Sequence, residues 1–403
     1  MGDSNIRFEV VKKIAEANFR TRNLKDISKL NTASPPSVFI GSKLRYPLVN
    51  VGIMSPLERD EDAWIYDDEA YWAKSNLEIS DVLRLRNSLL NSRFQSKVTD
   101  TRLNKKFVNL AQEIAIGSKP VDVEIELKNR LRFKREKDRV LTPHGLRAGL
   151  KKAKVTSNVK VDRQVDKAIN DEIKAVQGIE MLYKRNFSEY TLNKILSVGV
   201  LGLKKNKKLV PTRWSITATD DMLGKYLWKQ VKEYKWLEDF ELHWGEFLGN
   251  SYVVLLFPGV WSYELFELYL PGSSWNPTQE VKASTDIEGF YGRKKYAFNT
   301  VGGYYAARLP ILEYLNKIKR QASVLAIRIE GPSYWAALGV WVVRESVKKA
   351  MAKKGMIFKT KDEMIESARQ IGKIKYDFDY EQIFQRSQLL KQIKTQRNLA
   401  EFF

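Results

Sequence analysis

The sequence predicts an α+β fold, in which helical N-terminal segments are followed by a mixed, largely antiparallel sheet flanked by helices. Apolar residues recur at helical spacing in the N-terminal half, whereas short apolar runs separated by Gly, Pro and Ser dominate residues 252–298. The chain has 403 residues, of which 43% are hydrophobic, so it can bury a sizeable core. At roughly 100–200 residues per domain, we expect two domains or one large one.

The N-terminal half combines several expected helices with one segment that resists helix formation. Residues 1–30 carry apolar side chains at near-helical spacing among Lys and Arg, which predicts a basic amphipathic helix. Residues 34–56 contain repeated Pro and Gly, so we expect a long structured loop or a loose hairpin. Residues 79–139 predict two or three helices with a break near Pro120, and residues 168–196 are also helical in pattern.

The C-terminal half is expected to supply the sheet. The apolar runs of residues 252–298 predict strands, and SVLAIRIE at 323–330 predicts a further strand. Residues 340–351 fit either a strand that enters a helix or one buried helix. Residues 361–395 are helical and charged, so we expect helices to close this part of the fold.

Composition narrows the classes of function. The 69 Lys and Arg against 48 Asp and Glu leave a net charge of +21, which predicts an anionic partner, most simply nucleic acid, with an anionic membrane surface as the alternative. The absence of Cys and the presence of two His exclude disulfides, thiolate zinc sites, cysteine nucleophiles and a multi-histidine metal centre. No membrane span or signal peptide is evident, so we expect a cytoplasmic, chromosome-associated protein with no membrane partner.

The most basic stretch, residues 128–167, is the first candidate for a surface that contacts the phosphate backbone. Within it, a turn at His144 precedes Arg147, Lys151 and Lys152. Such a turn can begin a helix whose free backbone amides bind an anion. The alternative is a solvated, charged face joined by a plain connector.

A second candidate site lies in residues 198–230. A Lys-rich turn precedes Arg213 and Trp214, and the adjacent carboxylates Asp220 and Asp221 follow at an expected helix start. An aspartate can activate water or hold a metal ion, and an arginine can bind phosphate. The alternative is a buried Arg–Asp ion pair in which Asp221 also caps the helix.

The chain ends in QRNLAEFF, so that Gln396, Leu399, Phe402 and Phe403 form a Q-x-x-L-x-x-F-F pattern. This pattern resembles the motif by which DNA-processing proteins dock on the sliding clamp PCNA. One helical turn projects the leucine and both phenylalanines together as an apolar plug, while the glutamine hydrogen-bonds beside it. The alternative is a tail that packs back on its own domain.

Four long segments carry a family resemblance. They are SPPSVFIGSKLRYPLVNVGIMSP (34–56), LVPTRWSITATDDMLGK (209–225), YGRKKYAFNTVGGYYAARLPILEYL (291–315) and RQASVLAIRIEGPSYWAALGVWVVRE (320–345). In this order, and with the clamp-binding tail, they resemble the archaeal Nre family of DNA-repair proteins. The resemblance implies a basic, DNA-facing N-terminal part at 1–290, a C-terminal part at 291–395, and a PCNA-interacting tail at 396–403.

The resemblance also implies recruitment to PCNA and a role in the response to DNA damage. Many family members carry an N-terminal cysteine pattern that suggests zinc, and this chain has no Cys, so that element is missing here. In the expected C-terminal part, the candidates for stacking on an unpaired or flipped base are Tyr291, Tyr304, Tyr305 and Trp335, and Arg308 is a candidate for contact with nucleic acid. The alternative for these aromatic residues is a place in the core.

Three functions are open at this point. The first is a base-excision DNA glycosylase with lyase activity on oxidised bases such as 8-oxoguanine, in which an aspartate assists and Lys295 acts as nucleophile. The second is a metal-dependent phosphoester hydrolase or nuclease, in which Asp220 and Asp221 hold Mg²⁺ or Mn²⁺. The third is a non-catalytic adaptor that bridges PCNA and damaged duplex DNA. No cofactor is assigned beyond the metal of the second hypothesis.

Overall fold

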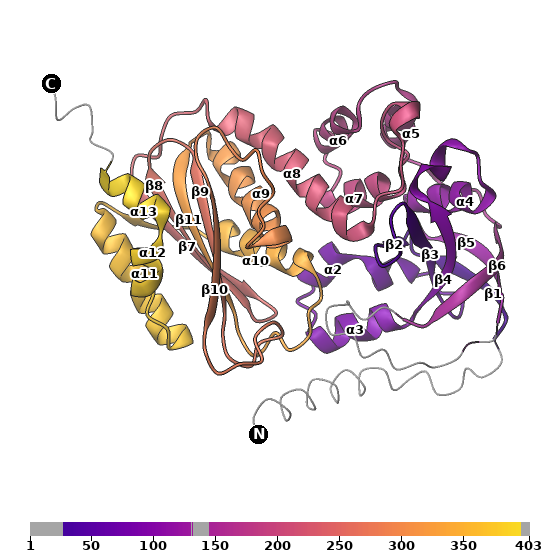
Figure 1. Ribbon diagram of the computed structural model, residues 1–403, viewed down its shortest axis with the longest axis horizontal. Helices are drawn as coiled ribbons and strands as arrows, with labels where there is room; N and C mark the ends of the chain where they lie inside the picture. The colour runs from indigo at the N-terminus through magenta and orange to yellow at the C-terminus, as the bar shows by residue number, and fades with distance from the viewer. Residues whose placement is uncertain (1–26, 130, 132–144, 396–403) are drawn as a thin grey trace. The chain divides into compact units, whose positions relative to one another are not determined.

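The computed structural model describes residues 27–129, 131 and 145–395, which form two compact units (Figure 1). Within these residues, the N-terminal unit covers 27–223 with 336–338, and the C-terminal unit covers 224–335 with 339–395. The expected helix over 1–30 falls largely outside the described residues. The turn at His144 and the tail at 396–403 fall outside them as well.

The N-terminal unit is built on a six-stranded sheet in the order β1-β5-β6-β4-β3-β2. All neighbouring strands are antiparallel except β4 and β6, which are parallel. The strands are β1 (Lys29–Ser34), β2 (Val38–Gly41), β3 (Leu48–Pro56), β4 (Leu89–Lys97), β5 (Val121–Leu127) and β6 (Arg147–Val155). The antiparallel hairpin of β2 and β3 confirms the loose hairpin expected for residues 34–56.

Short helices surround this first sheet. They are η2 (Ala63–Asp67), α2 (Glu69–Lys74), α3 (Ile79–Asn87), η3 (Val98–Arg102), α4 (Lys106–Ala115), α5 (Arg163–Asn170), α6 (Ala175–Tyr183), α7 (Glu189–Ser197) and η4 (Lys204–Asn206). The helix α8 (Thr212–Val231) follows and contains the boundary between the units. Residues 168–196 are helical as predicted.

The prediction of only helices for residues 79–139 is wrong, because β4 and β5 lie between and after the two helices. The sequence of β5, VDVEIEL, alternates strictly, with Val123 and Ile125 buried and Glu124 exposed. An alternation of buried and exposed side chains with a period of two residues indicates a strand, and the prediction of helices overlooked this alternation.

The C-terminal unit holds a second six-stranded sheet in the order β10-β9-β11-β8-β7-β12, in which only β9 and β11 are parallel. The strands are β7 (Phe240–Phe247), β8 (Asn250–Pro258), β9 (Ser262–Tyr269), β10 (Lys282–Glu288), β11 (Ala322–Glu330) and β12 (Met356–Phe358). The strands expected in 252–298 are present up to Glu288, whereas residues 289–298 form a loop, so the strand prediction is wrong there. The strand expected at 323–330 is present, and the two mixed sheets with their helices confirm the α+β class.

Helices cover both faces of the second sheet (Figure 1). They are α9 (Val301–Ile318), α10 (Val340–Ala352), α11 (Lys361–Tyr376), α12 (Glu381–Arg386) and α13 (Gln388–Thr395). Residues 340–351 thus form a helix, the second of the two expected alternatives. Among the described residues, no helix combines the length and the apolar character that a membrane span requires.

The two faces of this sheet differ in chemistry. On the face under α11, α12 and α13, residues such as Phe266, Leu325 and Ile327 form an apolar core. The carboxylate of Glu264 is buried there and accepts hydrogen bonds from Ser387 Oγ (2.5 Å) and from two backbone N–H groups at the start of α13. A buried side chain of β9 therefore fixes the helix that precedes the C-terminal tail.

The other face buries ion pairs. Arg328 contacts Glu267 at 2.7 Å and Glu330 at 2.8 Å, with all three side chains less than a tenth exposed. Arg308 of α9 contacts Glu288 of β10 at 2.8 Å, and this pair is equally enclosed. Removing one partner of such a pair leaves an uncompensated buried charge, which costs about 3–5 kcal/mol. The pair of Arg308 and Glu288 holds α9 on the sheet.

Candidate nucleic-acid interface

The segment between β10 and α9, residues 289–300, is an exposed loop with the sequence GFYGRKKYAFNT. Tyr291 is 87% exposed and Phe298 is 75% exposed. Lys294 and Lys295 lie between them and are exposed as well. Among the described residues, no carboxylate lies within ion-pair distance of either lysine. Aromatic rings held in water beside unneutralised cations match the chemistry of surfaces that bind single-stranded or distorted nucleic acid.

The buried carboxylate of Asp286, on the strand β10 that precedes the loop, anchors this loop. Asp286 accepts hydrogen bonds from the backbone N–H of Asn299 (2.9 Å) and of Thr300 (2.8 Å) and from the Thr300 hydroxyl (2.9 Å). Its other oxygen pairs with Arg293 at 3.0 Å. The loop is therefore pre-organised, so that little conformational entropy remains to be lost on binding.

Arg293 connects the two sides of the same loop. Its guanidinium donates to the carbonyl of Ile287 (2.8 Å), to that of Lys295 (3.2 Å) and to that of Tyr296 (3.2 Å). The planar guanidinium satisfies several acceptors at once, which a lysine ammonium cannot do in a fixed fork geometry. Arg293 is thus a structural cation, and Lys294 and Lys295 are the ones that face solvent.

Three residues expected to contact a base lie beneath this loop. Tyr304 is fully buried, and Tyr305 and Arg308 are nearly so. The Tyr305 hydroxyl accepts a hydrogen bond from the Ala297 N–H (3.0 Å), and its ring stacks on Tyr296 with centroids 5.4 Å apart. Burial raises the pKa of Tyr304 well above its usual value, so its phenol stays neutral. In this structure the three side chains support the loop, and direct base contact by them stays a prediction.

Arg213 and Trp214 begin a second exposed patch, which lies wholly in the N-terminal unit. Both are exposed in the first turn of α8, and Trp214 lies 6.3 Å from the ring of Tyr46, which is 55% exposed. Tyr46 belongs to the connection between β2 and β3, which also carries the exposed Lys43 and Arg45. The predicted cation and aromatic pair is therefore at the surface, with an aromatic neighbour that sequence analysis missed.

Asp220 and Asp221 do not lie at a helix start, so the expectation that Asp221 caps the helix is wrong. The helix begins eight residues earlier, where the Pro211 carbonyl accepts from the N–H groups of Trp214 (2.8 Å) and Ser215 (2.9 Å). Asp220 is buried and Asp221 is half-buried. Consecutive helical residues point about 100° apart, so the two carboxylates do not converge on one point.

No group of three or more His, Asp or Glu side chains with metal-binding geometry occurs within the described ranges. Lys295 is an exposed residue of the loop 289–300. It belongs to the C-terminal unit, whereas Asp220 and Asp221 belong to the N-terminal unit. The three residues proposed for catalysis are therefore not brought together within either unit.

The basic strand β6 carries Arg147, Lys151 and Lys152, so the expectation that a helix begins after the turn at His144 is wrong. Lys151 contacts Glu126 of β5 at 2.5 Å, and Lys152 contacts the same carboxylate at 3.7 Å. The hydrogen bond from Lys151 lowers the pKa of Glu126, so the glutamate stays charged. The neighbouring acidic strand thus offsets the positive charge that the sequence assigned to this stretch. The turn residue His144 lies outside the described residues.

Sequence analysis also missed Phe298 and Asp286 as parts of an interface. The signal for Phe298 was present, since FYGRKKYAF places three cations among four aromatic residues. Nothing local marks Asp286, because its partners Asn299 and Thr300 are more than ten residues away along the chain. Such a contact becomes visible only once β10 and the start of α9 are folded.

These features describe an α+β protein that exposes aromatic side chains among Lys and Arg in each of its two units. The chain belongs to the archaeal Nre family: residues 5–276 match the model described as Archaeal Nre, N-terminal, and residues 288–402 match Archaeal Nre, C-terminal. This confirms the resemblance inferred from the sequence. The family models change over between 276 and 288, whereas the compact units divide after Leu223, and the boundary at 290 stays a prediction.

Three relatives show the extent of the similarity. The chain is 43% identical to DNA repair protein NreA of Haloferax volcanii over 321 residues. This alignment covers 78% of this chain and 76% of the relative. The chain is 39% identical over 350 residues to DNA repair protein NreA of Archaeoglobus fulgidus, with 86% and 87% covered. It is 35% identical over 372 residues to DNA repair protein NreB of the same organism, with 92% and 91% covered. No solved structure matches the chain significantly.

Proposed function

We propose that this chain is a DNA-repair protein that binds damaged DNA through the loop 289–300 and is recruited to PCNA by residues 396–403. One observation carries the DNA contact: Tyr291 and Phe298 are 87% and 75% exposed on a loop whose lysines face solvent. The relatives, each described as a DNA repair protein, support the repair role. The net charge of +21 supports a chromosome-associated, cytoplasmic setting.

The loop has the parts for contact with an unstacked base. Either exposed ring can stack on a base, which contributes about 1–3 kcal/mol per base regardless of its identity. Lys294 and Lys295 are placed to neutralise the phosphates on either side. Damaged or mismatched bases cost least to unstack, so such a loop favours them without reading sequence. The patch of Arg213, Trp214 and Tyr46 adds a second contact of the same chemistry.

For the chemistry, we propose base excision on an oxidised base such as 8-oxoguanine. Lys295 supplies the nucleophile: its neutral amine attacks C1′ of the sugar, the bond between the sugar and the base breaks, and the base leaves with the bonding electrons. The proton that the amine nitrogen loses passes to the departing base, and the step does not require Asp220 or Asp221, which belong to the N-terminal unit. In support, Lys295 is exposed within five residues of both exposed rings.

The non-catalytic adaptor is the second candidate, favoured by a specific observation. Asp286, the carboxylate that anchors the loop of Lys295, already accepts three hydrogen bonds and an ion pair. An adaptor does not use Lys295 as a nucleophile, so it needs no further carboxylate beside this lysine to accept a proton. The hydrolase hypothesis, by contrast, needs carboxylates that converge, and Asp220 and Asp221 diverge on α8.

Recruitment to PCNA rests on the tail motif of Gln396, Leu399, Phe402 and Phe403. The helix α13 ends at Thr395, directly before this motif, and Glu264 fixes the start of that helix. The helix to which the tail is joined is therefore anchored to the C-terminal unit. Deleting residues 396–403 is expected to abolish clamp binding and to leave DNA affinity unchanged.

The test uses duplexes that carry 8-oxoguanine, uracil or an abasic site, incubated with the full chain with and without EDTA and resolved with and without alkali. Base excision predicts breaks at one lesion that persist in EDTA and are lost in Lys295→Ala. Cleavage that EDTA abolishes would support the hydrolase. Binding without any product would leave the adaptor, and no preference for damaged DNA in binding or cleavage would overturn the proposed function.

A further inference from the structure

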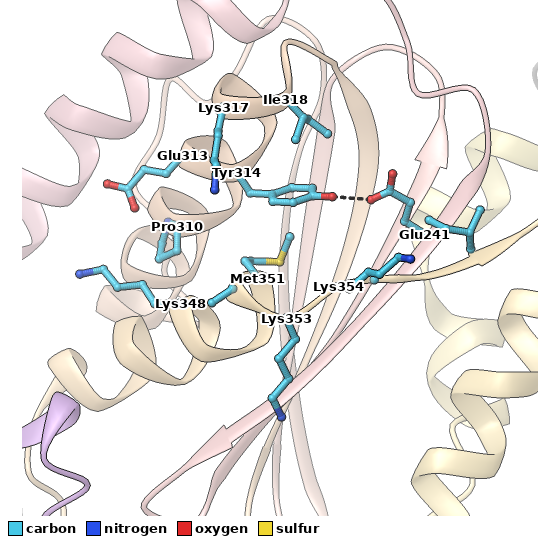
Figure 2. A pocket seen from close by; sticks show the side chains of 13 residues that line it. Glu241, Pro310, Glu313, Tyr314, Lys317, Ile318, Lys348, Met351, Lys353 and Lys354 are labelled. Atoms are coloured by element: carbon cyan, nitrogen blue, oxygen red, sulfur yellow. Dashed lines mark hydrogen bonds between the residues drawn. The ribbon is translucent and has the colours of Figure 1, made fainter.

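A groove of about 550 Å³ lies in the C-terminal unit between α9, α10 and the start of β12 (Figure 2). Four lysines contribute to it: Lys317 from α9, Lys348 from α10, and Lys353 and Lys354 from the segment between α10 and β12. The loop 289–300 is not among its lining residues. Its position at the C-terminal half of α9 is roughly 20 Å along the helix from that loop, at 1.5 Å per residue.

The positive charges of this groove are only partly offset. Lys348 pairs with Glu345 at 3.0 Å. Lys317 and Lys354 have no carboxylate within ion-pair distance among the described residues. Figure 2 shows Lys317 directed between Glu313 and Tyr314, whereas Lys353 is directed away from them. Lys353 instead lies over the ring of Trp244, with its ammonium 4.8 Å from the centroid.

The carboxylate of Glu241 is already committed to partners of its own. One of its oxygens accepts from the Tyr314 hydroxyl at 2.7 Å and lies 3.2 Å from Nε2 of the buried His243. Burial acts to raise the pKa of Glu241, but the hydrogen bonds from His243 and Tyr314 outweigh it, so the pKa is lowered. These contacts hold the Tyr314 side chain in place across the groove (Figure 2).

Apolar surface completes the groove beside Tyr314. Pro310 and Ile318 of α9, Met351 of α10 and Ile357 of β12 line it. A groove that combines apolar and aromatic walls with cations at its edge suits a ligand with a flat ring and an anionic group. Inorganic anions alone would leave the apolar part unused, and an apolar ligand would leave two lysines unpaired.

We propose that this groove binds a phosphate-bearing nucleotide, with the base against Tyr314 and Met351 and with Lys317 and Lys354, on either side of Tyr314, as the cations available to the phosphate (Figure 2). The volume is within the range of roughly 300–1,000 Å³ typical of small-molecule sites. The nucleotide is either free or the 5′-phosphorylated end of a DNA strand, since both present the same chemistry. The proposal goes beyond the DNA contact of the loop 289–300 and does not depend on it.

The experiment measures binding of AMP, dGMP and adenosine to the full chain by calorimetry, without DNA present. The two nucleotides are expected to bind, and adenosine, which lacks the phosphate, at least about tenfold more weakly. A second arm compares a short oligonucleotide with and without a 5′-phosphate. Preference for the phosphorylated oligonucleotide alone would identify a strand end as the source, and binding of the mononucleotides would identify the free nucleotide.

Two variants make the test specific to the groove. Lys317→Ala combined with Lys354→Ala is expected to weaken nucleotide binding by about tenfold or more, because it removes both cations available to the phosphate. Lys353→Ala is the matched control, since it removes an equally exposed lysine that points away, and binding is expected to change less than about twofold. The proposal is overturned if neither phosphate-bearing probe binds, if adenosine binds as well as AMP, or if the double variant binds like the native chain.

Because Tyr291 and Phe298 lie outside the groove, replacing both with Ala is expected to leave AMP binding unchanged. Failure of DNA binding through the loop and failure of nucleotide binding in the groove are therefore separate results. Loss of AMP binding in the Tyr291 and Phe298 variant would place the nucleotide at the loop and would overturn the assignment to the groove.

Discussion

Two basic regions of this protein, the strand β6 and the loop 289–300, differ in what surrounds their lysines. Lys151 and Lys152 of β6 share the carboxylate of Glu126 on the neighbouring strand. Lys294 and Lys295 of the loop have no such neighbour among the described residues and lie between exposed aromatic rings. A run of like charge in the sequence therefore does not locate a binding surface, because the next strand decides whether that charge is available.

The largest effect is expected from the aromatic rings of the loop. Tyr291→Ala combined with Phe298→Ala should weaken binding to single-stranded or lesion-bearing DNA by about 30-fold or more, since each stacked base contributes about 1–3 kcal/mol. Fluorescence anisotropy at one fixed salt concentration measures this. The matched comparison is Lys151→Ala combined with Lys152→Ala, which should change the affinity less than about threefold. Equal losses in the two variants would remove the distinction between the regions.

The next effect concerns the anchor of the loop. Asp286→Ala removes the acceptor for Asn299, Thr300 and Arg293, and it is expected to lower the free energy of unfolding by about 2–4 kcal/mol. Thermal or denaturant unfolding measures this. Asp239→Ala serves as control, because Asp239 pairs with the exposed Lys359 in the same unit and should cost less than about 1 kcal/mol. A native unfolding curve for Asp286→Ala would show that the loop is not anchored in this way.

The lysines of the loop are expected to act through salt dependence. Lys294→Ala combined with Lys295→Ala should lower the slope of log affinity against log salt concentration by roughly 2, at about 0.9 per neutralised phosphate. The variant of Lys151 and Lys152 should leave the slope nearly unchanged. Affinities measured between low and physiological salt give both slopes. A larger change in the β6 variant would reverse the roles assigned to the two regions.

The smallest effect tests the role of the acidic neighbour. Glu126→Gln removes the charge that offsets Lys151 and Lys152, and it is expected to raise DNA affinity by about twofold, as for an exposed ion pair of less than 1 kcal/mol. The same anisotropy assay detects it. A fall in affinity would mean that Glu126 positions these lysines for DNA rather than neutralising them.

Much of the secondary structure in the C-terminal half followed from local sequence pattern. The apolar runs within 252–288 and at 323–330 are strands because they are bounded by turn residues. The secondary structure of the N-terminal half was harder to predict. The strand β4 begins with an apolar pair and continues with mainly polar residues, of which Gln95 is exposed. Its pairing with β3 and β6, which no local pattern encodes, determines that it is a strand.

The sequence predicted the types of residue in the candidate site better than it predicted which of these residues are exposed. Arg213 and Trp214 are exposed side by side, as a contact site requires, while Tyr304, Tyr305 and Arg308 are buried under the loop. The mixed aromatic and basic composition of residues 290–308 does not separate the rings that face water from those that pack on the sheet. The contacts of Asp286 and Glu288 with residues more than ten positions away make that separation.

The most direct test of the account is to locate where DNA touches the chain. A lesion-bearing duplex with a photoreactive base beside the lesion is cross-linked to the full chain, and the linked peptide is identified by mass spectrometry. The account predicts cross-links within residues 289–300, at Tyr291 or Phe298. Cross-links confined to residues 147–155 of β6 would contradict it.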